Sequence, residues 1–194
     1  MTDVRLTCVR HGETRHNIKG IIQGWIGSEL TEHGHQQAQE FADNFNEKPQ
    51  AIFYSDLNRT KQTVAALIIK YPDIPVFADW RLRERSYGSL EGTSRDTVDW
   101  KSFFNTHPDE SLFGSEPENH IRERVKSFMR DMAYHNISHA IVVTHGGTLN
   151  QFKYILNPNH TRIKHANTES FDIEYSFNNP RIKAGSIPRW NIND

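Results

Sequence analysis

The sequence predicts an α/β fold with a largely parallel central sheet, and three observations support this. Short runs rich in β-branched and aromatic residues alternate along the chain with longer segments of helical periodicity. The run 140–144 (Ala-Ile-Val-Val-Thr) is almost entirely apolar, as expected for a strand buried on both faces at the centre of a sheet. The length of 194 residues is that of one domain, so we expect residues 1–194 to form a single domain.

Strands are predicted wherever the apolar pattern is short or alternating. Apolar and polar side chains alternate over residues 4–10 and again over 171–175, which predicts half-buried strands. The runs 51–54 and 74–78 are short and mostly apolar, and we expect strands there as well. Residues 181–185 are expected to pair with the last strand.

Helices are expected between these strands. Apolar residues recur at helical spacing from Leu30 to Phe45, with Thr31 as the N-cap. The next helix is expected to be capped by Ser55 or Asp56 and to end at Pro72. Its apolar stripe is predicted to consist of Val64, Leu67, Ile68 and Tyr71. Further helices are predicted over residues 121–132 and 147–156, and loops over residues 12–27 and 81–92.

Composition and charge argue against several classes of protein. The 23 Lys and Arg residues are balanced by 24 Asp and Glu, so nothing indicates a nucleic-acid partner. The longest aliphatic run, 64–69, is far shorter than the ~20 residues that cross a membrane, so no membrane association is expected. Cys8 is the single cysteine, and the charged first residues do not resemble a secretory signal. We therefore expect a cytoplasmic protein without an intrachain disulfide.

The residues suited to chemistry follow three of the predicted strands. Arg10, His11 and Gly12 follow the first strand, Arg59 lies shortly after the second, and His145 follows the central one. Ligands of parallel α/β sheets bind outside the carboxyl ends of the strands. Taken singly, each arginine is typical of a solvated charge, and each histidine of a packing or capping residue. Their convergence on one edge of the sheet instead predicts a phosphate site.

These side chains fit the hydrolysis of a phosphate ester. Arginine offers paired donors to phosphate oxygens, and nearby positive charge lowers the pKa of a histidine. A neutral histidine keeps a lone pair that can attack phosphorus and form a covalent intermediate. We expect Gly12 to let the main chain approach the phosphate without a side-chain clash. A second histidine can donate to the oxygens on which charge accumulates.

The remaining parts of the site are expected between residues 82 and 113. Segment 82–92 offers Glu84 and Glu91 as proton donors to the leaving group. The alternative for either carboxylate is a surface ion pair with Arg83, Arg85 or Arg95. Segment 94–113 is the candidate cover of the substrate. Its aromatic residues, Trp100, Phe103 and Phe104, either contact the substrate or form a small satellite core.

Five motifs occur in order between about residue 4 and residue 150. They are Arg10-His11-Gly12-Glu13-Thr14 with Asn17, Gln23-Gly24-Trp25 with Leu30-Thr31, Ser55-Asp56-Leu57 with Arg59, Leu82-Arg83-Glu84 with Leu90-Glu91-Gly92, and Val142-Val143-Thr144-His145-Gly146-Gly147. Together they resemble the histidine phosphatase superfamily, which includes the phosphoglycerate mutases. Their number and order make the resemblance specific, although Arg-His-Gly alone is a weak signal.

The resemblance implies a role for each of these residues. His11 would be the nucleophile that becomes phosphorylated, while Arg10, Arg59 and His145 would complete the phosphate pocket. Glu84 would protonate the leaving group and later activate water. The other residues implied to lie near the substrate or its phosphate are Asn17, Gln23, Gly24, Tyr87 and Gly146. The fold would be a three-layer α/β/α sandwich with a mostly parallel sheet, and hydrolysis would need no metal or organic cofactor.

The implied substrate is a small phosphorylated metabolite, and the favoured reaction is hydrolysis. A cofactor-dependent phosphoglycerate mutase is the alternative, although such mutases carry a basic insertion that the interval between Glu84 and His145 lacks. A cysteine phosphatase that used Cys8 would require an arginine where Thr14 stands. A metal hydrolase and a non-catalytic phosphate-binding module are further alternatives, and a homodimer is compatible with the sequence.

Overall fold

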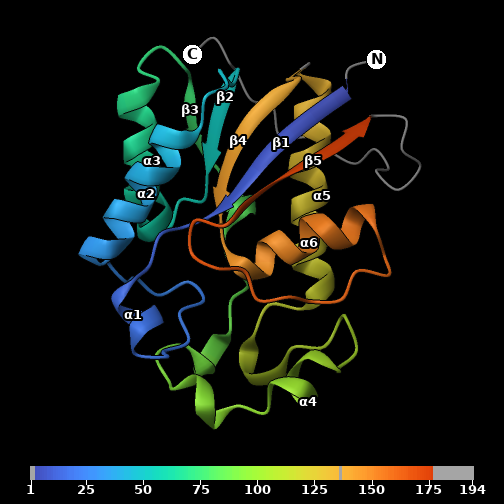
Figure 1. Cartoon of the computed structure of the whole chain (residues 1–194). Coiled ribbons are helices and arrows are strands. Elements are labelled where there is room, and N and C mark those ends of the chain that lie inside the picture. The colour runs from blue at the N-terminus through green and yellow to red at the C-terminus, as the bar shows by residue number, and fades with distance from the viewer. Residues whose placement is uncertain (1–2, 136, 177–194) are drawn as a thin grey trace.

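A five-stranded sheet forms the centre of the computed structural model, which describes residues 3–135 and 137–176 (Figure 1). The spatial order of the strands is β3-β2-β4-β1-β5. Neighbouring strands are parallel except for β5, which runs antiparallel to β1. The predicted mostly parallel sheet is therefore confirmed. The strands are β1 (Asp3–Arg10), β2 (Ala51–Tyr54), β3 (Val76–Ala78), β4 (His139–Thr144) and β5 (Ser170–Ser176).

Helices cover both faces of this sheet, as the prediction of three layers requires. Helices α2 (Glu32–Asn44) and α3 (Asn58–Lys70) lie on one face, and α5 (Glu118–Tyr134) and α6 (Gly146–Leu156) lie on the other (Figure 1). The short helices α1 (Arg15–Ile18) and α4 (Trp100–Phe104) lie beyond the carboxyl end of β4. Short 3₁₀ turns occupy Trp80–Leu82, Gly88–Leu90, Arg95–Thr97 and Leu112–Gly114.

The core consists of two apolar clusters, one on each face of the sheet. Successive side chains of a strand point to opposite faces. In β1, Leu6 and Cys8 accordingly join the cluster under α5 and α6, whereas Val9 joins the cluster under α2 and α3. In β4, Val142 and Val143 divide in the same way. Because both faces of β1 and β4 are buried, these strands hold their carboxyl ends in fixed positions.

Some of the predicted local details are confirmed and others are wrong. Thr31 caps α2, since its side chain accepts a hydrogen bond from the Gly34 amide at 2.9 Å. By contrast, Leu57 occupies the N-cap of α3, and no side chain caps that helix. Ile68 is 42% exposed and does not belong to the buried stripe, because the core side of α3 is already filled by its neighbours. Residues 181–185 lie outside the described residues.

Residues 79–117 connect β3 to α5 and form a cover over the carboxyl end of the sheet (Figure 1). A buried ion-pair network anchors the start of this cover. Arg81 bonds Asp79 and Asp131 of α5, each at 2.7 Å, and all three side chains are almost fully buried. Removing one partner from such a network leaves a buried charge uncompensated, which costs about 3–5 kcal/mol. The network therefore fixes the chain immediately ahead of Glu84.

Candidate active site

The two predicted histidines meet at the carboxyl ends of β1 and β4. These strands are parallel, and Arg10 lies beside Thr144 in their register. The next residue on each strand therefore lies at the same edge, and the His11 amide donates to the Thr144 carbonyl at 2.9 Å. The two imidazole rings are 5.2 Å apart between centroids. Topology thus brings together side chains that are far apart in the sequence.

Hydrogen bonding determines which nitrogen of His11 carries the proton. Its Nδ1 lies 2.7 Å from the Gly12 carbonyl oxygen. A carbonyl can only accept, so Nδ1 must donate and the neutral ring keeps its lone pair on Nε2. Burial, together with the charges of Arg59 and Arg10, holds the pKa of His11 well below its ordinary value of 6.5. His11 is therefore a neutral imidazole with a bare Nε2 at neutral pH.

Close packing of two main chains explains the glycine that follows His11. A Cβ atom on Gly12 would lie 2.4 Å from the carbonyl oxygen of Gly34, at the start of α2. The Gly12 amide is bonded instead to Thr63 Oγ1 of α3, at 3.0 Å. The small size of Gly12 is therefore required by Gly34, and the expectation that phosphate approaches the Gly12 main chain stays a prediction. These contacts with α2 and α3 fix the His11 main chain.

Arg59 extends from the first turn of α3 into the interior of the site. Its Nε donates to His145 Nδ1 at 3.1 Å, and its other nitrogens donate to the carbonyls of Gly24 at 2.7 Å and Ile26 at 3.3 Å. Burial lowers the pKa of Arg59 to about 10, so the guanidinium stays charged at neutral pH. Gly24 thus contributes a carbonyl that orients the arginine. Arginine carries five N–H donors, so donors remain for a phosphate.

Protein groups engage both ring nitrogens of His145, which sequence reasoning did not anticipate. Nδ1 accepts from Arg59 Nε, so the neutral ring carries its proton on Nε2, which lies 2.8 Å from Ser55 Oγ. Burial, with Arg59 as the next cause, holds the pKa of His145 well below its ordinary value. In this arrangement His145 orients Arg59. Donation from His145 Nε2 to a phosphate oxygen would require the bond to Ser55 to be exchanged.

A small cavity of about 50 Å³ lies in front of His11 and Arg59. Asn17, Gln23 and Arg10 also line it. The Asn17 side-chain oxygen is occupied by Thr14, so its NH₂ group is the part that can donate to a ligand. Arg10 Nε and Gln23 Oε1 are buried and, within the described part of the chain, have no hydrogen-bond partner. Buried polar atoms of this kind are typical of a site that a ligand completes.

Glu84 lies at the junction of this small cavity and a larger one of about 320 Å³. Its two carboxylate oxygens accept from the amides of Arg85 at 2.8 Å and Gly147 at 3.0 Å. A Cβ atom on Gly147 would lie 2.2 Å from Glu84 Oε1, so only glycine allows this approach. Gly146 lines the same larger cavity. The start of α6 therefore fixes the position of the Glu84 carboxylate.

The structure distinguishes between the two interpretations of Glu84 and Glu91, as a proton donor or as part of a surface ion pair. Two of the three expected partners of a surface ion pair are engaged elsewhere, since Arg83 pairs with Asp56 and Arg85 pairs with Glu118. Glu91 Oε1 accepts from the Tyr87 amide at 2.9 Å and thereby shapes a turn of the cover. Only Glu84 of the two lines the cavities described here. The structure therefore favours Glu84 as the acid.

The aromatic residues of the cover pack together and also line the cavity, so the satellite core is confirmed and contact with a substrate stays a prediction. Trp100 and Phe103 lie 5.6 and 5.8 Å from the Tyr87 ring, between centroids. Tyr87 and Trp100 also line the small cavity, and Phe104 lines the larger one. Burial raises the pKa of Tyr87, so its hydroxyl keeps its proton. The satellite core is thus also the wall of the site.

Sequence reasoning did not assign three residues to the site that the structure places there. Ser55 binds His145, Thr63 binds the Gly12 amide, and Arg95 lines both the small and the larger cavity. Ser55 and Thr63 stand close to Arg59 in the sequence, and this proximity was the available signal. Arg95 carried none, because its position depends on how the cover folds.

Two structural observations concern metals and membranes. Within residues 3–135 and 137–176, no three His, Cys, Asp or Glu side chains are placed to hold a metal ion together. In the same residues, no helix combines the length and the apolar character needed to cross a lipid bilayer.

The lowered histidine pKa values predict that acid destabilises the fold. His11 and His145 stay neutral in the folded chain but take up protons below pH 6.5 when it unfolds. The unfolded state then binds more protons, so the free energy of unfolding falls as pH drops below 6.5. Urea denaturation at pH 7 and pH 5.5 measures the decrease in the free energy of unfolding between the two pH values. We expect this decrease to be about 1 kcal/mol smaller in His11→Asn than in the wild type. The asparagine amide can keep the bond to the Gly12 carbonyl.

The matched control is His120→Asn at an exposed position of α5. This side chain is exposed in the folded protein and in the unfolded chain, so the variant should keep the full acid-induced loss. An equal loss in wild type and His11→Asn would contradict the assignment of a neutral His11.

Comparison with known proteins shows to which family the chain belongs. The model of the histidine phosphatase superfamily (branch 1) matches residues 6–187. The chain belongs to this superfamily. A crystal structure of phosphoglycerate mutase from Bacillus anthracis superimposes with a TM-score of 0.79, covers 90% of this chain and 89% of that one, and is 20% identical in sequence. The three-layer fold derived above is therefore that of known histidine phosphatase superfamily structures.

Two curated relatives are similar over most of the described fold. The putative phosphoserine phosphatase 2 of Hydrogenobacter thermophilus is 34% identical over 161 residues, which is 78% of either chain. The metal-independent phosphoserine phosphatase of Arabidopsis thaliana is 37% identical over 157 residues, or 74% of this chain and 65% of the relative. The names of both relatives describe them as phosphatases.

Proposed function

We propose that the chain hydrolyses phosphomonoesters of small metabolites through a phosphohistidine formed on His11. The observation that carries the proposal is the bare Nε2 of a neutral His11 in one cavity with Arg10, Arg59 and Glu84. These groups provide a nucleophile, two cations for the phosphate oxygens and a carboxyl group for proton transfer. The phosphatase names of the relatives support hydrolysis.

The reaction proceeds in two steps. His11 Nε2 attacks phosphorus, the bond from phosphorus to the ester oxygen breaks, and protonated Glu84 gives its proton to the departing oxygen. Water then attacks the phosphohistidine while Glu84 takes up its proton, and the bond from phosphorus to nitrogen breaks. His11 keeps its Nδ1 proton on the Gly12 carbonyl throughout. Phosphate is released, and His11 and Glu84 return to their initial states.

The arginines stabilise the charge that spreads over the phosphoryl oxygens. Arg59 is held by protein acceptors before any ligand binds, so little reorganisation is needed in the transition state. Arg10 is fixed by one nitrogen on the His165 carbonyl at 2.6 Å, while its buried Nε lacks a partner among the described residues. This Nε is the donor that we assign to the phosphate. His145 acts through Arg59 as a positioning residue.

Phosphate release from a panel of phosphomonoesters tests the proposal, with EDTA present throughout. We expect metal-independent hydrolysis, because His11 and two arginines supply the nucleophile and the positive charge. Including 3-phosphoglycerate with a 2,3-bisphosphoglycerate primer tests the mutase alternative. Isomerisation of 3-phosphoglycerate with little phosphate release would replace hydrolysis by the mutase reaction. Loss of all turnover on addition of EDTA would point to a metal hydrolase.

The domain organisation, the cellular location and the oligomeric state are also proposed. We take the whole of residues 1–194 as one catalytic domain that acts without nucleic acid, in keeping with its near-neutral net charge. A cytoplasmic location is supported by a single cysteine, Cys8, that is free and buried. A homodimer is tested by sedimentation of the purified chain.

A further inference from the structure

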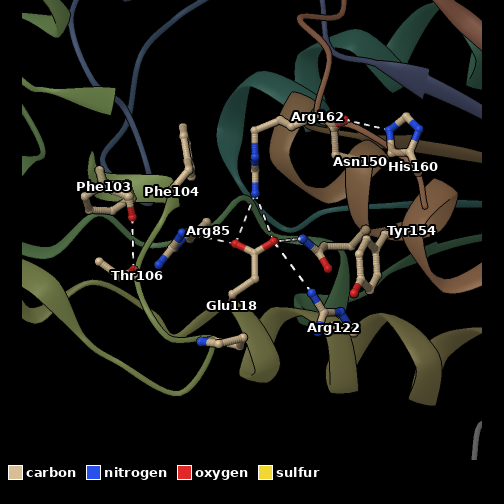
Figure 2. A pocket seen from close by; sticks show the side chains of 12 residues that line it. Arg85, Phe103, Phe104, Thr106, Glu118, Arg122, Asn150, Tyr154, His160 and Arg162 are labelled. Carbon is tan, nitrogen blue, oxygen red and sulfur yellow. Dashed lines mark hydrogen bonds and ion pairs between the residues drawn. The ribbon is translucent and has the colours of Figure 1, made fainter. Parts of the chain in front are cut away.

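The cleft continues outward from the catalytic groups into two adjoining cavities. The cavity of about 320 Å³ shares Arg10, Glu84, Tyr87 and Arg95 with the small cavity in front of His11. It shares Phe104, Asn150 and Arg162 with a further cavity of about 270 Å³ (Figure 2). Arg162 therefore lines both of the outer cavities that adjoin the catalytic groups.

Positive side chains outnumber carboxylates along this outer cleft. The two carboxylates that line the outer cavities are Glu84 and Glu118. Glu118 is shared by three arginines, since it pairs with Arg85 at 3.1 Å, Arg162 at 2.9 Å and Arg122 at 3.9 Å (Figure 2). One negative charge cannot neutralise three positive ones, so this end of the cleft keeps an excess of positive charge.

Two further cations face the middle of the cleft without an acidic partner. Lys164 lies two residues beyond Arg162 in the loop between α6 and β5, and Arg95 belongs to the cover. Neither side chain forms an ion pair with any residue that the structure describes. Arg95 lies over the Trp100 ring at 5.2 Å, and Arg162 lies over Phe104 at 4.0 Å. The aromatic wall thus holds these two arginines beside the cavity.

We propose that the preferred substrate carries a second anionic group on its leaving group, and that Arg162 and Lys164 bind it. This inference rests on the proposed function, because it assumes that the scissile phosphate lies at His11. Charges along a cleft with apolar walls produce a concentrated potential, so an anion is attracted there more strongly than to isolated surface lysines. A carboxylate and a second phosphate share the required chemistry. A neutral or purely cationic leaving group gains nothing from these residues.

Matched substrates test the proposal directly. O-phosphoserine and O-phosphoethanolamine differ by one carboxylate, and fructose 1,6-bisphosphate and fructose 1-phosphate differ by one phosphate. We expect the member with the extra anion to have a kcat/KM about tenfold higher or more, as a charge-assisted hydrogen bond provides. The pair with the larger difference identifies the anion as carboxylate or phosphate. Equal kcat/KM values within both pairs would overturn the proposal.

Three variants assign the effect to the residues. Lys164→Gln and Arg162→Gln should each reduce the ratio of kcat/KM within the preferred pair several-fold, mainly through KM. Arg162→Lys should restore part of the ratio, because lysine keeps the positive charge that attracts the second anion. Lys101→Gln is the matched control, since Lys101 is exposed on α4 and lines none of these cavities, and it should leave the ratio unchanged. Ratios unaffected by both Gln variants would refute the assignment.

The results that would refute hydrolysis differ from those that would refute the anion site. Calorimetric titration of the wild-type chain measures binding of the same matched pairs without requiring turnover. A binding preference for phosphoserine over phosphoethanolamine in the absence of any phosphate release would refute hydrolysis but support the anion site. Turnover of both esters with no preference in binding or kinetics would support hydrolysis and refute the anion site.

Discussion

Replacing His11 by asparagine is expected to lower kcat for phosphomonoesters by about 10⁴-fold or more, the usual consequence of removing a covalent nucleophile. Asparagine can retain the hydrogen bond to the Gly12 carbonyl, but its amide nitrogen has no free lone pair with which to attack phosphorus. Initial rates of phosphate release measure the loss. Quenching the wild-type enzyme with ³²P-labelled substrate should trap a label that survives alkali and is lost in acid, as a phosphoramidate is.

The same label should be absent from His11→Asn. His120→Asn, at the exposed position on α5, is the matched control and should retain both label and rate. A trapped label in His11→Asn would mean that another residue, with His16 of α1 as the nearest in sequence, receives the phosphoryl group. Near-normal rates in His11→Asn would overturn the covalent mechanism altogether.

Glu84→Gln is expected to slow alkyl phosphates far more than activated aryl phosphates. An alkoxide is a poor leaving group and needs a proton from Glu84, whereas p-nitrophenolate leaves without one. We expect kcat/KM to fall about 10²–10⁴-fold for an alkyl phosphate such as glycerol phosphate, and less than about tenfold for p-nitrophenyl phosphate. Steady-state kinetics with both substrates measure the two losses.

The ratio of the two losses serves as an internal control. Glutamine also replaces a carboxylate oxygen that accepts from the amide of Gly147 or Arg85, so it perturbs the local geometry. Such a perturbation affects every substrate alike, while loss of the acid affects only poor leaving groups. Equal losses on both substrates would therefore remove Glu84 from the acid role and leave it a structural one.

Much of the fold could be predicted because it depends on short-range patterns. Alternation along β1 and the apolar run of β4 located both strands, and Thr31 marked the start of α2. The local errors came from tertiary contacts. Ser55 or Asp56 was expected to cap α3, but Leu57 occupies the N-cap and the Ser55 hydroxyl lies against His145 Nε2. Ile68 fitted the helical stripe, yet the core side of α3 was already filled.

The composition of the site was predictable, but the hydrogen bonds within it were not. The rule that ligands bind at the carboxyl ends of parallel strands placed Arg10, His11 and His145 on one edge. It could not show that His145 would use both ring nitrogens on Ser55 and Arg59. Nor could it show that the Gly34 carbonyl leaves no room for a side chain at Gly12, since Gly34 is distant in sequence.

By itself, the sequence determined the parallel α/β sheet, the family resemblance and the identity of the candidate nucleophile. The sheet follows from patterns within single segments, and the resemblance and the nucleophile follow from the order of five motifs along the chain. Only the tertiary structure decided that Glu84 rather than Glu91 faces the cavity, and that Lys164 and Arg162 add positive charge to the outer cleft. The physical reason is that burial, proton position and electrostatic potential depend on distances between segments. A sequence pattern fixes spacing along the chain but not those distances.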